Sequence, residues 1–187
     1  TKAPVAELLI QYSRGTAFSS DIICRLCHSD YSHCDIRIES ALERGLLGVS
    51  GEDHKLGDIG GVRLRPIPAW EYRNPPKIAR LPVSTHVYDS VMEIGHAQLG
   101  KPFDNGALWG FLSDTPGDRD WRDTASWFCS EFVIYCLEQA GFFPYQLIAA
   151  KNRITPADSL HLLNPFMSPE NIEEFRPWPK TLPIQSG

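Results

Sequence analysis

Two residues of this 187-residue sequence, Cys129 and His33, have the types and settings needed for nucleophilic catalysis. Cys129 stands just before an apolar pattern with four-residue steps from Phe132 to Ala140, which predicts a helix over about Ser130–Ala140. A thiolate is favoured at such a place, because the first-turn N–H groups have no acceptor within the helix and the helix dipole is positive at this end. The sequence therefore predicts Cys129 as a nucleophile.

The other cysteines are expected to play lesser roles. Cys136 falls on the apolar face of the predicted helix and reads as an inert core thiol, with Gly141 ending the helix. The chain has five cysteines, an odd number, and is long enough to fold without disulfides. Free thiols in a reducing compartment, the cytoplasm by default, are the expectation.

A cysteine nucleophile needs a base, usually a histidine held by a third polar group. The segment around His33 alternates, so that His33, Asp35 and Arg37 share one face of a predicted strand while Cys34, Ile36 and Ile38 share the other. This polar row fits either a cleft wall or a solvent-facing strand edge. His33 is the predicted base and Asp35 its predicted partner, with Glu39 and Ser50 as alternatives for the third group.

A competing interpretation is a metal or haem site. The run Cys24-Arg25-Leu26-Cys27-His28 has the C-x-x-C-H spacing of covalent haem attachment, and with His33 and Cys34 it could supply zinc ligands. A second cysteine pair at zinc-finger spacing is missing, and the β-rich composition of this run does not suit haem attachment. We therefore expect no metal and no cofactor, and a metal-binding protein remains the alternative.

The remaining pattern predicts the elements that must position these residues. Four strands in an antiparallel meander and two further helices are expected. The strands are placed at Ile22–Leu26, Tyr31–Glu39, Gly45–Ser50 and Gly60–Ile67, and the helices at Tyr88–Leu99 and from Pro156, capped by Thr155, to Leu163.

Other segments are less regular. Val5–Tyr12 fits either a helix or a strand, and Trp70–Leu81 reads as a Pro-rich connection. Lys101–Thr124 reads as a long loop of the kind that walls a cleft, and residues 164–187 as an extended Pro-rich tail. Asp21 and Asp104 are expected to cap turns.

Composition excludes several classes of function. The net charge of -5 has no basic block behind it, which argues against a nucleic-acid partner. No apolar run approaches the length of a membrane span, so stable membrane insertion is not expected. The chain begins with Thr1 rather than Met, which leaves export or a phage particle open as locations, and no pattern indicates an oligomeric state.

Six short motifs, taken in order, resemble those of the circularly permuted papain-like cysteine hydrolases, the YiiX-like branch of the NlpC superfamily, which includes uncharacterised bacterial and phage members. They span about residues 19–160. The motifs are Ser19–Ile23, Tyr31–Ile36, Gly61–Pro66, Gly100–Asp104, Phe128–Val133 and Ile154–Asp158.

The resemblance implies a fold and an activity. The fold would be a single α+β domain over residues 1–187, with an antiparallel, partly barrel-like sheet over about Ile22–Ile67 packed against the helix that carries Cys129. The activity would be hydrolysis of an amide bond, as in a peptidase or amidase acting on a cell-wall peptide, through an acyl-enzyme on Cys129 with His33 as base. We also expect nearby residues to contact substrate, namely Tyr31, Asp104, Trp127 and Ser130.

Alternatives stay open within this resemblance. Lecithin retinol acyltransferase-like enzymes share the permuted layout and match Phe128–Phe132 only at the Cys and the last Phe, so a lipid or ester acyltransferase or hydrolase is one alternative. Relatives often carry a polar third residue on the strand after the His strand, and Leu46–Ser50 has no carboxylate. A non-catalytic bacterial or phage module that kept the fold is therefore another.

Overall fold

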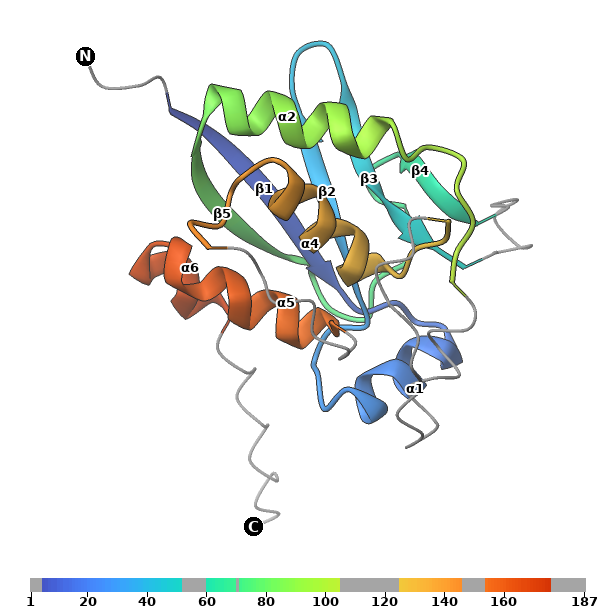
Figure 1. The fold of residues 1–187 in the computed structure, drawn as a ribbon. Coiled ribbons are helices and arrows are strands. Elements are labelled where there is room, and N and C mark those ends of the chain that lie inside the picture. Colours follow the sequence, from blue (N-terminus) through green and yellow to red (C-terminus); the bar gives the residue numbers. More distant parts are fainter. Residues whose placement is uncertain (1–4, 52–59, 70, 105–124, 146–153, 176–187) are drawn as a thin grey trace.

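The computed structural model describes residues 5–51, 60–69, 71–104, 125–145 and 154–175. Within these ranges the fold is mixed α and β, with a five-stranded antiparallel sheet in the order β4-β3-β2-β1-β5. The strands are β1 (Val5–Ser13), β2 (His33–Glu39), β3 (Arg44–Ser50), β4 (Gly61–Arg65) and β5 (Lys77–Ser84). The helical elements are α1 (Phe18–Leu26), α2 (Thr85–His96), α4 (Cys129–Gln139), α5 (Pro156–Leu163), the 3₁₀ helix η1 (Asn164–Phe166) and α6 (Pro169–Glu174). Figure 1 shows α2 and α4 crossing one face of the sheet.

The sheet begins earlier in the chain than the sequence predicted. β1 lies between β2 and β5, and its last residue, Ser13, pairs with His33. Strands β1 to β4 form a meander, and β5 returns to the free side of β1. The predicted partly barrel-like sheet over Ile22–Ile67 is therefore wrong: the sheet starts at Val5 and stays open, with β4 and β5 at its edges.

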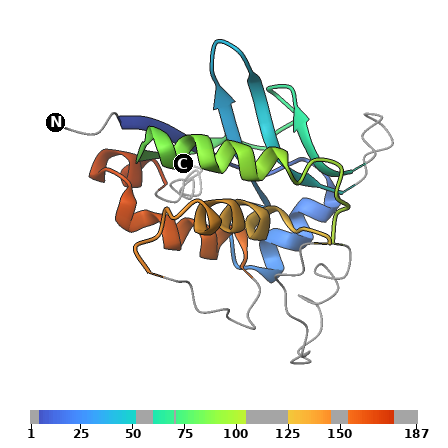
Figure 2. The same cartoon turned by 45° about the horizontal axis from the view of Figure 1, so that its top comes forward.

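Alternation along the strands builds the core between the sheet and the helices. Cys34, Ile36 and Ile38 of β2 face this core, as predicted from the period-two pattern. Helices α2 and α4 pack on each other and on the sheet, as Figure 2 shows from a second direction. Burial of this continuous apolar layer fixes where α4 begins relative to β2. Other fully buried members are Leu8, Ile10, Tyr12, Leu47, Val49, Leu81, Phe132, Val133 and Leu137.

The segment predicted as a first strand, Ile22–Leu26, is instead the second half of helix α1. A short apolar run without alternation does not distinguish a strand from a helix. Asp21 does not cap a turn: its carboxylate bonds Arg14 at 2.8 Å and Arg73 at 2.9 Å, so it ties the helix to two neighbouring segments.

Strand β5 lies partly within the stretch predicted to be a Pro-rich connection. Its alternation is regular, because Ala79, Leu81 and Val83 are buried while Arg80 and Pro82 are exposed. Pro82 is tolerated because β5 is an edge strand, where one row of N–H groups has no ladder partner. Helix α2 follows at once, starting three residues before the predicted Tyr88.

The C-terminal part of the described chain is more helical than predicted. The predicted helix from Thr155 to Leu163 is confirmed, with a full capping box between Thr155 and Asp158. Residues 164–175, predicted as extended, form η1 and α6, because Ser168 caps a second short helix with Pro169 at its first position. The rest of the predicted tail lies outside the described residues.

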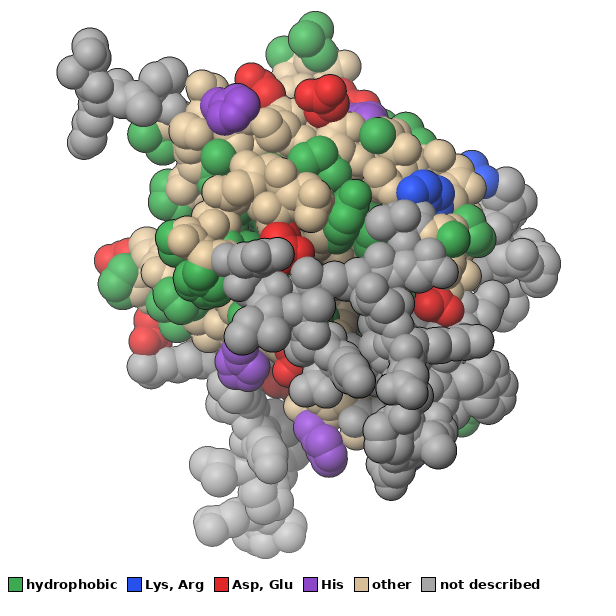
Figure 3. All heavy atoms as spheres, viewed as in Figure 1, with side chains coloured by type: hydrophobic (Ala, Val, Ile, Leu, Met, Phe, Trp, Pro, Cys, Tyr) green, Lys and Arg blue, Asp and Glu red, His purple; other side chains and the backbone are tan. Residues whose placement is uncertain are grey.

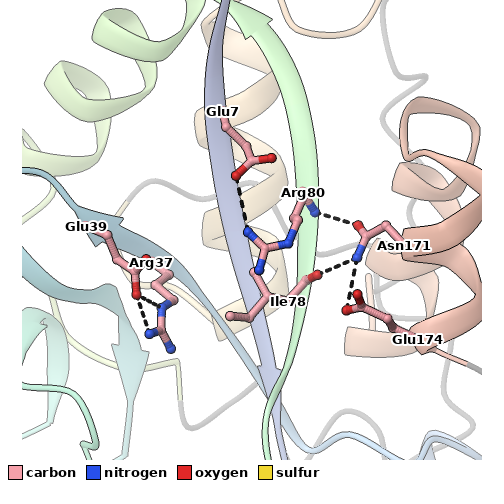
Figure 4. Close-up of polar contacts among 7 residues, drawn as sticks. All are labelled: Glu7, Arg37, Glu39, Ile78, Arg80, Asn171 and Glu174. Atoms are coloured by element: carbon pink, nitrogen blue, oxygen red, sulfur yellow. Dashed lines mark hydrogen bonds and ion pairs between the residues drawn. The ribbon is translucent and has the colours of Figure 1, made fainter.

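Helix α6 protects the edge of the sheet through one side chain. Asn171 accepts a bond from the Arg80 N–H at 2.7 Å and donates one to the Ile78 carbonyl at 2.8 Å, as Figure 4 shows. The amide thus satisfies the outward-facing backbone groups that a further strand would otherwise pair. The Glu7–Arg80 ion pair beside it, at 3.2 Å, is exposed.

The turn of the β2–β3 hairpin contacts the C-terminal end of α2. His96, the last residue of α2, bonds the Met92 carbonyl at 2.7 Å and the Glu43 carboxylate at 3.1 Å. Figure 3 shows acidic side chains gathered along this upper edge of the molecule. The His96–Glu43 contact therefore links the hairpin, and the strand that carries His33, to α2.

Candidate active site

Cys129 is the first residue of helix α4, as the sequence predicted. Phe128 is the N-cap, in an extended conformation, and the first helical bond runs from the Phe132 N–H to the Phe128 carbonyl. The Cys129 N–H belongs to the first turn, whose N–H groups have no acceptor within the helix. Phe128 and Phe103 pack against Cys129, which is 1% exposed. Helix α4 ends before Gly141, whose φ of 71° is the left-handed conformation typical of a helix terminus.

His33 and Asp35 lie at the start of β2 on one face of the strand. His33 Nε2 is 2.9 Å from Asp35 Oδ1, so the carboxylate fixes the ring. The Asp35 side chain is completely buried, whereas that of His33 is 12% exposed. Of the three candidates for the third group, the structure therefore brings Asp35 to His33. Glu39 instead pairs with Arg37 in an exposed position, shown in Figure 4.

The two halves of the site meet where β2 and β3 separate. The ladder between these strands runs from Glu39 to Ile36 and goes no further toward His33. There the Cys129 thiol lies close enough to the His33 ring and to the side chain and backbone of Cys34 for all three to influence its pKa. Asp35 contacts Nε2 of His33 and so sets the orientation of the ring beside Cys129.

Electrostatics in this group favour a thiolate and an imidazolium. Burial alone raises the pKa of Cys129, but hydrogen bonds from Cys34 and His33 and the positive charge of His33 outweigh burial and hold the pKa well below its ordinary value. Burial alone lowers the pKa of His33, but the negative charges of Asp35 and Cys129 raise it to about 10. The site is thus poised as an ion pair at neutral pH.

Cys34, which the sequence placed on the inner face of β2 and among possible zinc ligands, lies beside Cys129 in the site. Burial raises the pKa of the Cys34 thiol, and the negative charge on Cys129 raises it further, so Cys34 stays protonated and can donate its proton toward Cys129. Its sulfur is also 4.0 Å from Ser159 Oγ, which is 3.0 Å from the Tyr12 hydroxyl. A buried chain of polar groups therefore leads from Cys129 to α5 and β1.

Gly48 of β3 is the other residue missed at the sequence level. A Cβ at Gly48 would lie 1.9 Å from Asp35 Oδ1, so only a glycine leaves room for the carboxylate between the strands. A glycine in the middle of an otherwise apolar strand often marks such a close approach, and this was the available signal. Strand β3 therefore contributes no carboxylate of its own. Gly48 instead leaves the space that the Asp35 carboxylate of β2 occupies.

The residues predicted to contact substrate lie in different settings. Trp127 and Ser130 are fully buried, and the Ser130 hydroxyl donates to the Ile154 carbonyl, so both hold α4 in place. Asp104 donates its backbone N–H to the Trp127 carbonyl at 2.9 Å. Tyr31 is half-buried, stacks edge-on with Tyr12 and lines a small pocket of about 40 Å³ with Ser13 and Arg14.

The metal alternative receives no support from the described part of the chain. Cys24 is buried in α1 and His28 is exposed just after it, with a positive φ of 47°. No group of three or more His, Cys, Asp or Glu side chains among the described residues is arranged to hold a metal ion. Most of the predicted loop Lys101–Thr124, and Trp70, lie outside the described residues.

Comparison with known proteins gives little further information. No model of a known protein family matches the chain, and no curated protein matches it. Among solved structures, the chain is similar to the metalloprotein YiiX from Escherichia coli O157:H7, with 16% sequence identity, a TM-score of 0.49 and coverage of 89% of this chain and 90% of the other. Among the described residues, none of the helices is long and apolar enough to span a membrane.

Proposed function

We propose that the chain is a cysteine hydrolase of the circularly permuted papain-like type that cleaves an amide bond. The observation that carries the proposal is the buried group in which His33, fixed by Asp35 at 2.9 Å, lies next to Cys129 at the start of a helix. Nucleophile, base and orienting carboxylate come from two elements packed on each other, which keeps the geometry fixed.

The chemistry follows from the placement of the proton. The Cys129 thiolate attacks the carbonyl carbon of the amide, and the first-turn N–H of Cys129 stabilises the negative oxygen that forms. The His33 imidazolium gives its proton to the leaving amine as the C–N bond breaks, which leaves a thioester on Cys129. Neutral His33 then takes a proton from water, whose oxygen attacks the thioester and releases the acid.

Asp35 acts on this cycle through His33. Its buried carboxylate holds the ring through Nε2 and stabilises the imidazolium in each half of the cycle. The single domain, the peptide-like amide substrate and the substrate contacts at Tyr31 and Asp104 belong to the same proposal.

Trapping the acyl-enzyme tests the proposal. The wild-type chain is incubated with activated amide and ester acyl donors, and the covalent mass and its position are read by mass spectrometry. We expect a thioester on Cys129 that hydroxylamine removes and that Cys129→Ala abolishes. Cys27→Ala is the matched control, because Cys27 is a half-buried thiol beside the site, and it should label like the wild type.

Two results would change the assignment. Acylation by esters alone would move the function to the ester or lipid alternative. The exposure of Cys129, only 1%, favours a second candidate, a non-catalytic module that kept the fold. That candidate gains if Cys129 reacts with acyl donors and with iodoacetamide no faster than Cys27 does.

A further inference from the structure

Cys129 has a second sulfur beside it, which the hydrolytic cycle does not need as a nucleophile. Cys34 follows His33 on β2, and its side chain lies close enough to Cys129 for each thiol to shift the pKa of the other. Both cysteines are free thiols and both are buried, at 0% and 1% exposure. They belong to β2 and α4, which pack directly on each other, so two packed elements of the fold rather than a loop carry the two cysteines.

The geometry points to a reversible oxidation site in which Cys34 resolves an oxidised Cys129 by forming a Cys34–Cys129 disulfide. As a means of regulating activity, this inference rests on the proposed function. The oxidation itself requires only the two thiols. The oxidant is a small hydroperoxide such as hydrogen peroxide. The disulfide would store Cys129 in a form that cannot attack a carbonyl.

The steps balance without any further reactant. The Cys129 thiolate attacks one oxygen of hydrogen peroxide, the O–O bond breaks, and Cys129 becomes a sulfenic acid while hydroxide leaves. The Cys34 sulfur then attacks the Cys129 sulfur, the S–O bond breaks, and water leaves with the Cys34 proton. Two thiols are oxidised and one peroxide is reduced. A dithiol reductant such as dithiothreitol reduces the Cys34–Cys129 disulfide back to two thiols by thiol–disulfide exchange.

The protonation states of the two cysteines suit their separate roles. Cys129, held as a thiolate by Cys34 and His33, is the sulfur that a peroxide oxidises first. Cys34, kept protonated by burial and by the charge of Cys129, is spared until a sulfenic acid forms next to it. Cys34 is the resolving group because it belongs to the same folded chain and lies beside Cys129, whereas an external thiol must first diffuse into the site.

Cys27 is the rival partner. It lies close enough to interact electrostatically with Cys129, but the two side chains share no hydrogen bond. Burial raises the pKa of Cys27 to about 12, so it is also a protonated thiol. Mapping the cross-link therefore has to separate Cys34 from Cys27.

The experiment oxidises the full reduced chain with stepwise hydrogen peroxide and maps peptides without reduction. We expect loss of two hydrogen atoms in the intact mass, a cross-linked peptide pair containing Cys34 and Cys129, and full recovery of Cys129 alkylation by iodoacetamide after dithiothreitol. In Cys34→Ser, which keeps a proton donor, Cys129 should pass to the sulfinic acid and recover less than about a tenth of its alkylation. Cys27→Ser, the matched control, should behave like the wild type.

The inference is overturned if wild-type Cys129 goes directly to the sulfinic acid, if it links to Cys27, or if Cys34→Ser recovers fully. Mapping in the wild type needs no variant, so a misfolded Cys34→Ser would not obscure the result. The cross-link is read without substrate, which separates this inference from the proposed function. A disulfide without acyl-enzyme would remove the hydrolase alone, and an acyl-enzyme without disulfide would remove the oxidation site alone.

Discussion

Gly48 of β3 faces Asp35 of β2 so closely that a Cβ at position 48 would lie 1.9 Å from Asp35 Oδ1, the oxygen that bonds His33. The backbone of one strand thus shapes the space for the carboxylate of the next. The Asp35 side chain is completely buried. The orientation of His33 consequently depends on a residue with no side chain.

Substitution of Gly48 tests this dependence. In Gly48→Ala the methyl group should displace the Asp35 carboxylate from His33, which lowers the rate of amide hydrolysis on the order of 10²-fold. Overpacking should also cost about 1–3 kcal/mol in the free energy of unfolding. The measurements are kcat/KM and urea unfolding. Gly51→Ala is the matched control, because its Cβ would meet no atom within 4 Å.

A double substitution separates positioning from a general packing defect. In the Asp35→Ala background the carboxylate is gone, so Gly48→Ala should have little further effect on kcat/KM. If the two substitutions multiply their effects instead, Gly48 does not act through Asp35.

Asp35→Asn keeps the shape of the side chain and removes its charge. The pKa of His33, at about 10 in spite of burial because of Asp35 and Cys129, should then fall toward its ordinary value of 6.5. The proposed hydrolysis needs the His33 imidazolium. The alkaline limb of the pH profile should therefore move to lower pH, and kcat should fall by about 10²–10⁴-fold. The pH profile of kcat checks this. Glu39→Gln should leave the profile unchanged, and a shift there would reopen the choice of third residue.

The pH dependence of Cys129 alkylation reports the thiolate directly. Hydrogen bonds from Cys34 and the charge of His33 overcome the effect of burial and hold the pKa of Cys129 below 9.0. We expect the iodoacetamide rate to be near its maximum at neutral pH and to fall only in acid, as the thiolate is protonated. A rate that rises roughly tenfold for each pH unit above neutral would indicate an ordinary thiol. His33→Ala should produce that ordinary profile.

Asn171 provides a test of the fold away from the site. Asn171→Ala removes both bonds to the edge of β5 and leaves the Arg80 N–H and the Ile78 carbonyl without this partner. The free energy of unfolding should drop by about 1–3 kcal/mol, with faster hydrogen exchange at Arg80. Glu7→Gln, which alters only the exposed ion pair with Arg80, should cost less than about 1 kcal/mol. Equal losses in the two variants would contradict the edge role of Asn171.

Local patterns in the sequence determined a large part of what positions the site. The four-residue apolar steps after Cys129 gave its place at the start of α4, and the Thr155-Pro156 pair gave α5, because capping and helical periodicity are properties of neighbouring residues. Alternation around His33 likewise placed His33 and Asp35 on one face of β2 and Cys34 on the other. Each of these features is set within a few residues of chain.

Only the tertiary structure decided the features that join distant segments. The run Ile22–Leu26 lies in a helix that its composition does not predict, and β5 is a strand that pairs with β1. The packing of α4 on β2 brings Cys129 to His33 and Cys34. The register of β2 and β3 sets the space that Gly48 leaves for Asp35. Register and packing are set by burial of the whole apolar face, which no local pattern contains.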